Sequence, residues 1–475
     1  MTFTSNFQQE RQPEMEREAE TRRRDLVVLV PSPFQGHVTP MLQLGHVLHS
    51  KGFSITVAHA RCNAPDPSNH PEFSFQSLGH SLSINLDGII KASDIGLKGR
   101  LETIYDMNEN CRVPLQEYLE EKGDVVSCII YDNLMFFVDQ VAALLNLPSI
   151  VLRPSSAAYF PVLLDVLEHE DTLSSIPESR LEDPIPEFHP IRYQDMPIVF
   201  RQSEKVRRFM LTSNNIRSSV AIIWNTMEDL EHTWLSRLQQ RYKVPIFPIG
   251  PLHKIAPASR TTSLIEEDDS CLAWLDDQVP QSVIFLSVCG SLAAINETDF
   301  EEIASGLADS NQPFLWAIQP SSIEGLEENE RLIEDFEKTT RNRGRVVKWA
   351  PQKKVLAHGS VGGFWSHCGW NSTLESLGEG VPMICRPHFA DQLVNSRLLI
   401  QEWKVGLELE KVERSVITET IRRIMVGDER EELKKNVMNM KQKLDDSFQK
   451  DEGTSKKAVN ELTNIISSLS LKFPL

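Results

Sequence analysis

Residues that could bind a nucleotide and present a sugar are concentrated in one stretch, which begins at Trp349 and ends at Gln392. It contains an aromatic residue, a short apolar run, a turn with glycine and a helical pattern that opens on Asn371 and Ser372. Backbone amides at the start of a helix point outward and attract phosphate. Trp349 can stack on a flat base. The stretch closes on Asp391 and Gln392, polar side chains suited to sugar hydroxyls.

Three further residues fit the same site. His367 stands just before the helix and can donate to a phosphate oxygen, and Ser291 follows a separate apolar run and offers a hydroxyl. Glu375 lies one helical turn beyond Asn371, where a carboxylate suits the two hydroxyls of a ribose. Each residue alone has a structural explanation, because buried tryptophans are usually core and Glu375 also fits an exposed helical position. Their combination in one stretch favours nucleotide binding.

A second candidate site lies near the start of the chain. His37 follows the apolar run 26–30 and precedes a helical pattern, so the positive end of that helix is expected to keep the imidazole neutral. A neutral histidine can accept a proton at pH 7. Asp132 follows another apolar run and could hold the other ring nitrogen, which makes the pair a candidate general base and orienting carboxylate. The alternatives are a histidine that only bonds to its own loop and an aspartate that caps the next helix.

Other chemistries lack their sequence signatures. Residues 378–383 begin like a dinucleotide fingerprint, but they end in methionine and run from a helix into a strand. The chain has no phosphate-loop motif and no Asp-x-Asp pair, so we expect neither a metal nor a cofactor. His46 and His49 have the spacing of a metal-binding pair, but no third ligand is in view and a surface helix explains them better.

Composition is that of a globular protein without a nucleic-acid partner. Of 475 residues, 40% are hydrophobic and 24% are charged. The net charge of -18 repels polyanions such as nucleic acids and anionic membrane surfaces. The seven cysteines are scattered without a Cys-x-x-Cys pair, which favours reduced thiols in a cytoplasmic protein. No apolar run approaches the roughly 20 residues that a membrane span requires.

Parallel sheets are predicted to position the candidate residues, because short aliphatic runs alternate with helical patterns. The predicted strands are 26–30, 53–58, 125–131, 221–224, 283–287, 314–318, 345–349, 361–365 and 382–385. Ligands of such sheets bind beyond the carboxyl ends of the strands, where both candidate sites lie. Residues 62–112 and 153–193 are rich in turn-forming residues and are predicted to be largely irregular.

The alternation of strands and helices is interrupted at residues 252–270, a polar stretch without apolar periodicity that predicts a linker. We therefore expect an α/β protein with two doubly wound, Rossmann-like domains, 25–251 and 271–455, which face each other across a cleft. Residues 1–24 are expected to form a disordered tail. Residues 456–475 are expected to form a C-terminal helix that packs back on the body.

The stretch from Trp349 to Gln392 resembles the signature box of plant small-molecule UDP-glycosyltransferases, from its first tryptophan through His-Cys-Gly-Trp-Asn-Ser to its closing Asp-Gln. The resemblance covers nearly the whole chain and includes the segments PFQGHVTPMLQL, IIWNTMEDLE, PIGPL, CLAWLDDQ and KVGLELE. The opening at Phe34 and the WNTMEDLE run resemble the branch that contains glucosyltransferases of steviol glycosides. Two positions depart from the family pattern, since Cys289 replaces a usual phenylalanine and Gln319 a common arginine. We expect both to tune affinity.

The resemblance implies the two-domain GT-B architecture and a role for each candidate residue. Trp349 and the main chain of Ala350 would bind uracil, and Gln352 and Glu375 would hold the ribose. The remaining donor-binding residues would be His367, Asn371, Ser372 and Ser291 at the phosphates and Trp370, Asp391 and Gln392 at the sugar. A glutamine at the closing position favours glucose. His37 would be the general base, with Asp132 as its partner.

The reaction that the resemblance implies is inverting transfer of glucose from UDP-glucose to a hydroxyl, carboxyl or amine of a small hydrophobic plant metabolite, without a metal. The alternative is a UDP-sugar-binding pseudoenzyme or sensor, which the presence of both His37 and Asp132 disfavours. A UDP-sugar and a small acceptor are the expected partners of a monomer. The residues expected to line the acceptor site, any of which could be core instead, are Phe34, Phe136, Tyr159, Phe160, Met196, Phe200 and Phe389.

Overall fold

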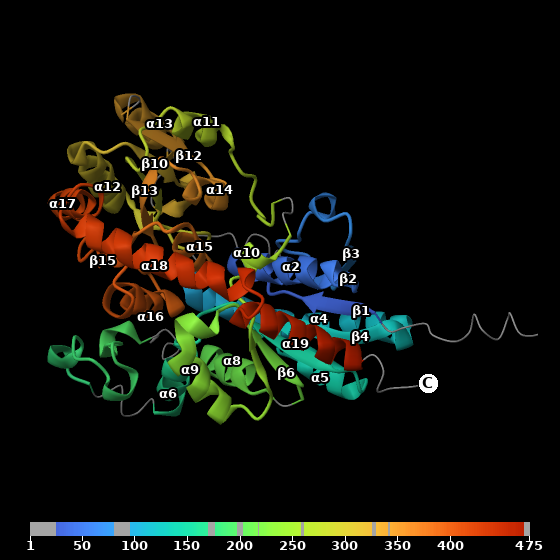
Figure 1. The fold of residues 1–475 in the computed structure, drawn as a ribbon. Helices are drawn as coiled ribbons and strands as arrows, with labels where there is room; N and C mark the ends of the chain where they lie inside the picture. Colours follow the sequence, from blue (N-terminus) through green and yellow to red (C-terminus); the bar gives the residue numbers. More distant parts are fainter. Residues whose placement is uncertain are drawn as a thin grey trace, which may run out of the picture.

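The structure is a computed structural model that describes residues 25–79, 96–169, 176–196, 203–216, 218–257, 261–324, 329–340 and 343–469. The predicted tail at 1–24, the last residues of the predicted C-terminal helix, 470–475, and Phe200 lie outside these ranges. Two parallel sheets, each covered by helices, form the two halves of the molecule (Figure 1). The predicted architecture of two doubly wound α/β domains is confirmed.

The N-terminal domain is built on a sheet of seven parallel strands in the order β3-β2-β1-β4-β5-β6-β7. Their bounds are β1 Leu26–Val30, β2 Ser54–His59, β3 Ser74–Ser77, β4 Val126–Asp132, β5 Ser149–Arg153, β6 Ala221–Trp224 and β7 Ile246–Pro248. Every residue of the central strands β4, β5 and β6 is buried because helices cover both faces of the sheet. One core lies under α2 (Gln35–Ser50) and α19 (Thr454–Leu469). The other lies under four helices, α4 (Gly96–Lys122), α5 (Phe137–Leu144), α6 (Tyr159–Glu168) and α8 (Glu204–Asn214).

The C-terminal domain is built on a sheet of six parallel strands in the order β12-β10-β8-β13-β14-β15. Their bounds are β8 Val283–Ser287, β10 Phe314–Ala317, β12 Gly344–Val347, β13 Val361–Ser366, β14 Met383–Cys385 and β15 Gly406–Glu408. A separate pair joins β9 (Ile295–Asn296) to β11 (Ile323–Glu324). The helices are α11 Ser270–Asp276, α12 Glu297–Ser310, α13 Asn329–Thr340, α14 Gln352–Leu356, α15 Trp370–Glu379, α16 Asp391–Arg397 and α17 Arg414–Met425.

Two long helices at the end of the chain join the domains. The helix α18 (Glu429–Gln449) packs against α15 of the C-terminal domain and against α9 (Glu228–Arg241) of the N-terminal domain. The next helix, α19, lies along the N-terminal sheet and buries Leu462 and Ile466 in its core (Figure 1). The chain therefore ends its described part on the domain in which it began.

The prediction of irregular structure is wrong for one helix in each of two ranges. The range 62–112 contains the first part of α4 (Gly96–Lys122), and the range 153–193 contains α6 (Tyr159–Glu168). In α4 the buried residues recur every three or four positions, at Leu101, Ile104, Met107, Cys111, Leu115 and Leu119. This is the period of one helical face, and it is masked by a polar exposed face and by Pro114 inside the helix.

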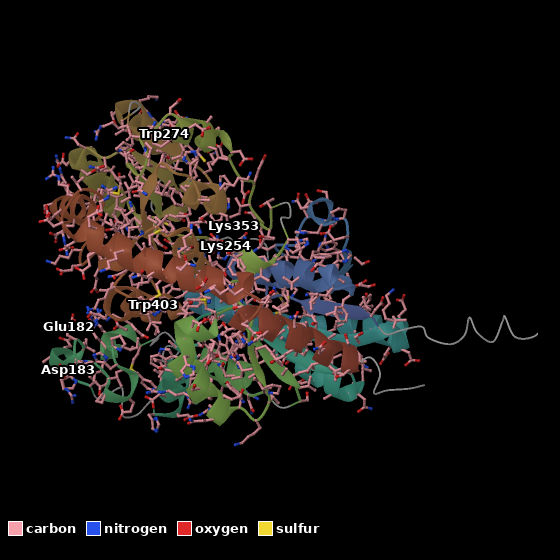
Figure 2. The ribbon with its side chains drawn as sticks, viewed as in Figure 1. Glu182, Asp183, Lys254, Trp274, Lys353 and Trp403 are labelled. Carbon is pink, nitrogen blue, oxygen red and sulfur yellow. The ribbon has the colours of Figure 1, made fainter. Side chains whose placement is uncertain are left out.

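Four further α-helices belong to the N-terminal part of the chain. Their bounds are α5 Phe137–Leu144, α8 Glu204–Asn214, α9 as given above and α10 Leu252–Ile255, which lies within the predicted linker. The side chain of Lys254 from α10 pairs with Glu379 at the end of α15. Figure 2 labels Lys254 and Lys353 at the junction of the two domains.

Candidate active site

The sheet brings His37 and Asp132 together although they are far apart in the chain. Strands β1 and β4 are neighbours, with Val30 paired to Tyr131, so the loop after β1 and the last residue of β4 meet at one edge. Nδ1 of His37 lies 2.7 Å from Oδ2 of Asp132. The other carboxylate oxygen accepts the backbone N–H of Leu134 at 3.0 Å. Asp132 is fully buried, and it ends β4 where the sequence analysis had placed it just after the strand.

The expectation that the helix would keep His37 neutral is wrong in direction. Burial lowers the pKa of His37, but the Coulomb attraction and hydrogen bond of Asp132, with a smaller contribution from Asp391, raise it above 6.5 overall. A buried carboxylate in direct contact acts more strongly than the helix terminus. Because Asp132 accepts a hydrogen bond from Nδ1–H, Nε2 of the neutral imidazole is free to accept a proton from a substrate. The His37 side chain is 27% exposed.

On the opposite side of the cleft, β8 and β13 place two loops next to each other, since Ser287 pairs with Ser366. Gly290 adopts φ of 55°, and a Cβ there would lie 2.7 Å from the ring of His367. Nδ1–H of His367 donates to the carbonyl oxygen of Ser287 at 3.2 Å. Burial, followed by the effect of His388, lowers the pKa of His367 to about 4. In this neutral form Nε2 is an acceptor, so the predicted bond to a phosphate oxygen requires His367 to gain a proton.

The side chains predicted to hold a ribose already contact one another. Nε2 of Gln352 donates to Oγ of Ser372 at 2.9 Å and to Oε2 of Glu375 at 2.7 Å. Burial raises the pKa of Glu375, although the hydrogen bond from Gln352 and the charge of Lys353 act in the other direction. Gln352 begins α14 and the other two residues lie in the first turns of α15. A diol entering here would compete with Gln352 for the carboxylate.

The linker supplies residues that the sequence analysis missed. The indole N–H of Trp349 donates to Oγ of Ser263 at 3.0 Å. Oε1 of Gln35, in the first turn of α2, accepts the backbone N–H of Leu264 at 2.7 Å. Thr262, Ser263 and Glu267 all line the cavity. A connection between two facing domains has to cross their cleft, so its hydroxyl residues could have been expected there.

The donor stretch is also bonded directly to the N-terminal domain. The indole N–H of Trp370 donates to the carbonyl oxygen of Asn225 at 2.7 Å, so this group is not available to a sugar hydroxyl. Nδ2 of Asn371 donates to the carbonyl oxygen of Gly36 at 3.0 Å, directly before His37. These bonds fix the distance between the two candidate sites.

Asp391 and Gln392, which close the stretch that begins at Trp349, line the cavity as predicted. Ala390 has φ of 55°, rare for a residue with a side chain, and it leads into α16 with Asp391 and Gln392 facing the cavity. Oε1 of Gln392 accepts the backbone N–H groups of His388 and Phe389 at 2.9 and 3.2 Å. Its Nε2 therefore has donors to offer a ligand. Burial raises the pKa of Asp391, and its carboxylate accepts Nδ2 of Asn395 at 2.9 Å.

Both sites open on one cavity of about 300 Å³. All eleven predicted donor-binding residues line it, together with His37 and, of the residues predicted for the acceptor, Phe34, Tyr159, Phe160 and Phe389. Two predicted acceptor residues do not line it. Phe136 packs against Tyr105 and Phe209, and Met196 is 1% exposed. The apolar part of the wall instead includes Leu101, Leu134, Met210 and Leu292.

Comparison with known proteins agrees with this geometry. The family model described as UDP-glucoronosyl and UDP-glucosyl transferase matches residues 120–450. The chain belongs to this family. It is similar to the UDP-glycosyltransferase 76E1 of Solanum lycopersicum, with 53% identity over 94% of this chain and 93% of the relative. It is also similar to the flavonol 3-O-glucosyltransferase UGT76E12 of Arabidopsis thaliana, with 41% identity over 93% of this chain and 97% of the relative.

Among solved structures, the UDP-glycosyltransferase is similar to Phytolacca americana UGT2 complexed with UDP-2fluoro-glucose and pterostilbene. The TM-score is 0.74 and the identity 27%, over 93% of this chain and 99% of that one. The plant family predicted from the signature box and its GT-B fold are therefore confirmed. In the described ranges, no group of three or more His, Cys, Asp or Glu side chains could hold a metal ion. None of the helices described here is long and apolar enough to cross a membrane.

Proposed function

We propose that this UDP-glycosyltransferase transfers glucose from UDP-glucose to a small hydrophobic plant metabolite and inverts the anomeric carbon. The observation that carries the proposal is the His37–Asp132 pair, 2.7 Å apart, on the cavity that the predicted donor residues also line. A sensor that only binds UDP-sugar would have no use for a histidine with a buried carboxylate partner. The relatives of this chain include a flavonol glucosyltransferase, which supports glucose as the sugar and a hydroxyl as the acceptor group.

The proposed mechanism begins with proton transfer. Nε2 of His37 removes the proton of the acceptor hydroxyl while Asp132 stabilises the imidazolium that forms. The acceptor oxygen attacks the anomeric carbon in line, the bond to the diphosphate breaks, and UDP leaves with a β-linkage formed. Holding both substrates in one cavity supplies much of the rate.

We propose that the donor is held by the residues of the signature box. Trp349 and Ala350 bind uracil, and Gln352 releases Glu375 to the ribose. The amides that open α15, together with Ser291 and a protonated His367, neutralise the leaving diphosphate without a metal. Nε2 of Gln392 and the carboxylate of Asp391 bind the sugar hydroxyls.

We propose that the acceptor half is lined by Phe34, Tyr159, Phe160 and Phe389. These side chains and their aliphatic neighbours favour a flat, mostly apolar acceptor. Scattered cysteines support a reducing, cytoplasmic location. We also infer a monomer with domains at 25–251 and 271–455, in which α19 completes the core of the first.

Incubation with UDP-glucose and a panel of flavonoids, stilbenes and terpenoid alcohols, followed by mass spectrometry, tests the proposal. A hexose added to at least one acceptor is expected. The variant His37→Ala should bind UDP as the wild type does and lose transfer to hydroxyl acceptors. A wild-type protein that binds UDP but transfers to no acceptor would favour the sensor.

A further inference from the structure

One wall of the cavity is the short segment 154–160, which comprises the connection from β5 to α6 and the first two residues of α6. Pro154, Ser155, Tyr159 and Phe160 all line the cavity. The two rings are almost wholly buried, with 6% and 2% of their surface exposed. A shift of the backbone in two or three residues of this segment would therefore change the shape of the acceptor half of the cavity. The donor-binding residues would stay in place.

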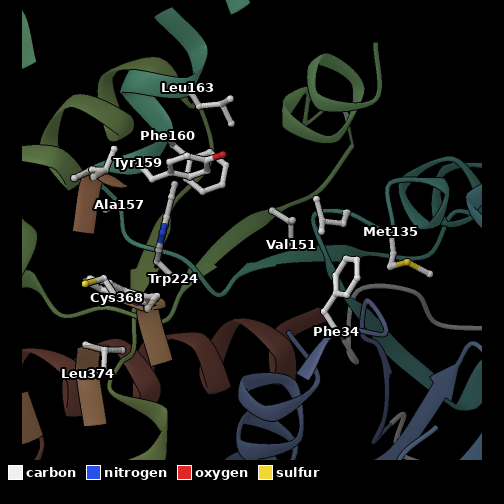
Figure 3. Packing of buried hydrophobic residues seen from close by; sticks show 14 of the residues in the cluster. Phe34, Met135, Val151, Ala157, Tyr159, Phe160, Leu163, Trp224, Cys368 and Leu374 are labelled. Carbon is white, nitrogen blue, oxygen red and sulfur yellow. The ribbon is translucent and has the colours of Figure 1, made fainter. Parts of the chain in front are cut away.

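The ring of Phe160 is held from behind on two sides. The guanidinium carbon of Arg153 lies 4.0 Å from the ring centroid, and the ring of Trp224 meets that of Phe160 edge-on with their centroids 5.0 Å apart. Figure 3 shows Trp224 beside Phe160. The indole N–H of Trp224 also donates to the carbonyl oxygen of Ser155 at 2.9 Å. Neither Arg153 nor Trp224 lines the cavity, so both act from the layer beneath it.

The backbone of the same segment is held by one carboxylate. The N–H groups of Ala157 and Ala158 donate to the two oxygens of Glu231, at 2.9 and 3.0 Å. The helix α6 begins at the next residue, and its N-cap Ala158 makes no side-chain capping bond of its own. Backbone N–H groups at a helix start need an acceptor, and a carboxylate is the strongest one available. Glu231 therefore shares the capping of α6 with Ser156, whose Oγ accepts the backbone N–H of Tyr159 at 3.2 Å.

Glu231 is a buried residue whose carboxylate contacts the start of α6 from a different helix. The residue belongs to α9, is 1% exposed and departs from helical geometry, with φ of -129° and ψ of 32°. It lies more than 70 residues from the amides that it binds, so the contact exists only in the folded domain. Burying a carboxylate is costly unless it is fully hydrogen-bonded. Here its two oxygens accept two adjacent amides that lead directly into the cavity wall.

We propose that Glu231 is a positioning residue for the acceptor: its carboxylate fixes the start of α6, and thereby the rings of Tyr159 and Phe160 against which the acceptor packs. The proposal rests on the proposed function, in which this wall belongs to the acceptor half. Loss of the carboxylate should therefore weaken acceptor binding and broaden acceptor choice, while donor binding is unchanged.

The charge of Glu231 supplies a readout that a merely structural contact would not move. The two hydrogen bonds from Ala157 and Ala158 to the carboxylate of Glu231 are called the Glu231 clamp. Both oxygens accept N–H groups, so the clamp requires the ionised carboxylate, and protonation would turn an O–H toward an amide. Burial raises the pKa of Glu231 to about 7, opposed by the hydrogen bonds from the backbone N–H groups of Ala157 and Ala158. The titratable group that faces it from the neighbouring helical turn Leu398–Glu402 is Glu402, which raises the pKa further. The clamp should therefore loosen as the pH falls through neutrality.

The test compares steady-state kinetics of the full-length wild type with Glu231→Gln, using an uncharged acceptor from the panel. Glutamine keeps the size, but its amide group faces one of the two N–H donors. We expect the acceptor KM to rise about tenfold, as for loss of one hydrogen bond to a charged group. The KM for UDP-glucose should stay within about twofold. Glu228→Gln is the matched control, because Glu228 lies on the same helix and binds the exposed His232.

A second measurement needs no variant. The acceptor KM of the wild type should rise several-fold between pH 8 and pH 6, with the KM for UDP-glucose unchanged, and Glu231→Gln should flatten this dependence. An acceptor KM that is flat across this range in the wild type would overturn the proposal even if the variant did not fold. Equal acceptor KM values for the variant and the wild type would also overturn it. A wild type that transfers no sugar would instead refute the proposed function.

Discussion

The substitution Asp132→Asn tests the proposed chemistry most directly. Asparagine has the same shape, but it lacks the charge that faces Nδ1 of His37 at 2.7 Å. Its single carbonyl oxygen can accept either from His37 or from the backbone N–H of Leu134, which Asp132 now binds at 3.0 Å. If it stays on Leu134, the amide group faces Nδ1 and moves the imidazole proton to Nε2. His37 can then no longer accept the proton of the acceptor.

The size of the effect follows from the contact. A hydrogen bond to a buried charge contributes about 1.5–3 kcal/mol, and general-base catalysis about 10²–10⁴ in rate. We therefore expect kcat to fall by about 10²–10⁴. Binding of UDP, measured by calorimetry, should change less than about twofold, because Asp132 does not line the cavity.

The pH dependence gives the sign of the interaction. In the wild type Asp132 raises the pKa of His37 above 6.5, and the rate should increase with pH as the imidazole loses its proton. Without the carboxylate, burial remains and lowers this pKa, so the acidic limb of kcat should move to lower pH. The assay is initial-rate UDP release from pH 5 to 9.

The control is a pair of the same residue types on the surface. Asp165 of α6 and His169, which follows the helix, are 3.0 Å apart, with 30% and 60% of their side chains exposed, and Asp165→Asn should leave kcat unchanged. An Asp132→Asn variant that folds and retains wild-type kcat, or whose acidic limb does not move, would refute the assignment of His37 as the base.

Three further predictions concern the donor side and stability. The variant Gly290→Ala should raise the KM for UDP-glucose about tenfold. The added Cβ would lie 2.7 Å from the ring of His367, and a side chain at φ of 55° would cost about 1–2 kcal/mol. Gly359→Ala is the control, because the space around Gly359 is open. Gln392→His should lower the preference for UDP-glucose over UDP-galactose in competition assays, and an unchanged ratio would contradict the sugar contact. The free energy of unfolding in urea should decrease as the pH falls below about 6.5. Burial lowers the pKa of His70 to about 4 and that of His253 to about 3, so the unfolded chain takes up these protons at higher pH than the folded protein does. The variant His253→Gln should make the free energy of unfolding depend less steeply on pH.

Most of the donor site could be predicted from the sequence because its residues are close together in the chain. The strand β13, the turn after it and the start of α15 fix the relative positions of His367, Asn371 and Ser372 through local geometry. The acceptor side was less predictable. Phe136 and Met196 have the same chemical character as Phe160, but only packing decides which aromatic or sulfur side chain reaches a cavity.

The errors have physical causes. The helix α4 was missed because its charged exposed face dominates the composition of that region. The pKa of His37 was predicted in the wrong direction because the prediction considered the helix terminus and left out the charge of its expected partner, Asp132. The pairing of β1 with β4 brings that carboxylate into direct contact with the ring. The indole N–H of Trp370 was available in the sequence and is occupied in the structure by a carbonyl of the other domain.

The amino-acid sequence by itself determined the two-domain α/β architecture, the family and the composition of the donor site, because these depend on local periodicity and on motifs of adjacent residues. Only the tertiary structure decided which residues act across the chain: Asp132 on His37, Ser263 on Trp349 and Glu231 on the start of α6. Each of these contacts joins residues tens to nearly a hundred positions apart. Their energies come from burial and hydrogen bonding, which exist only once the sheets have formed and the domains have met.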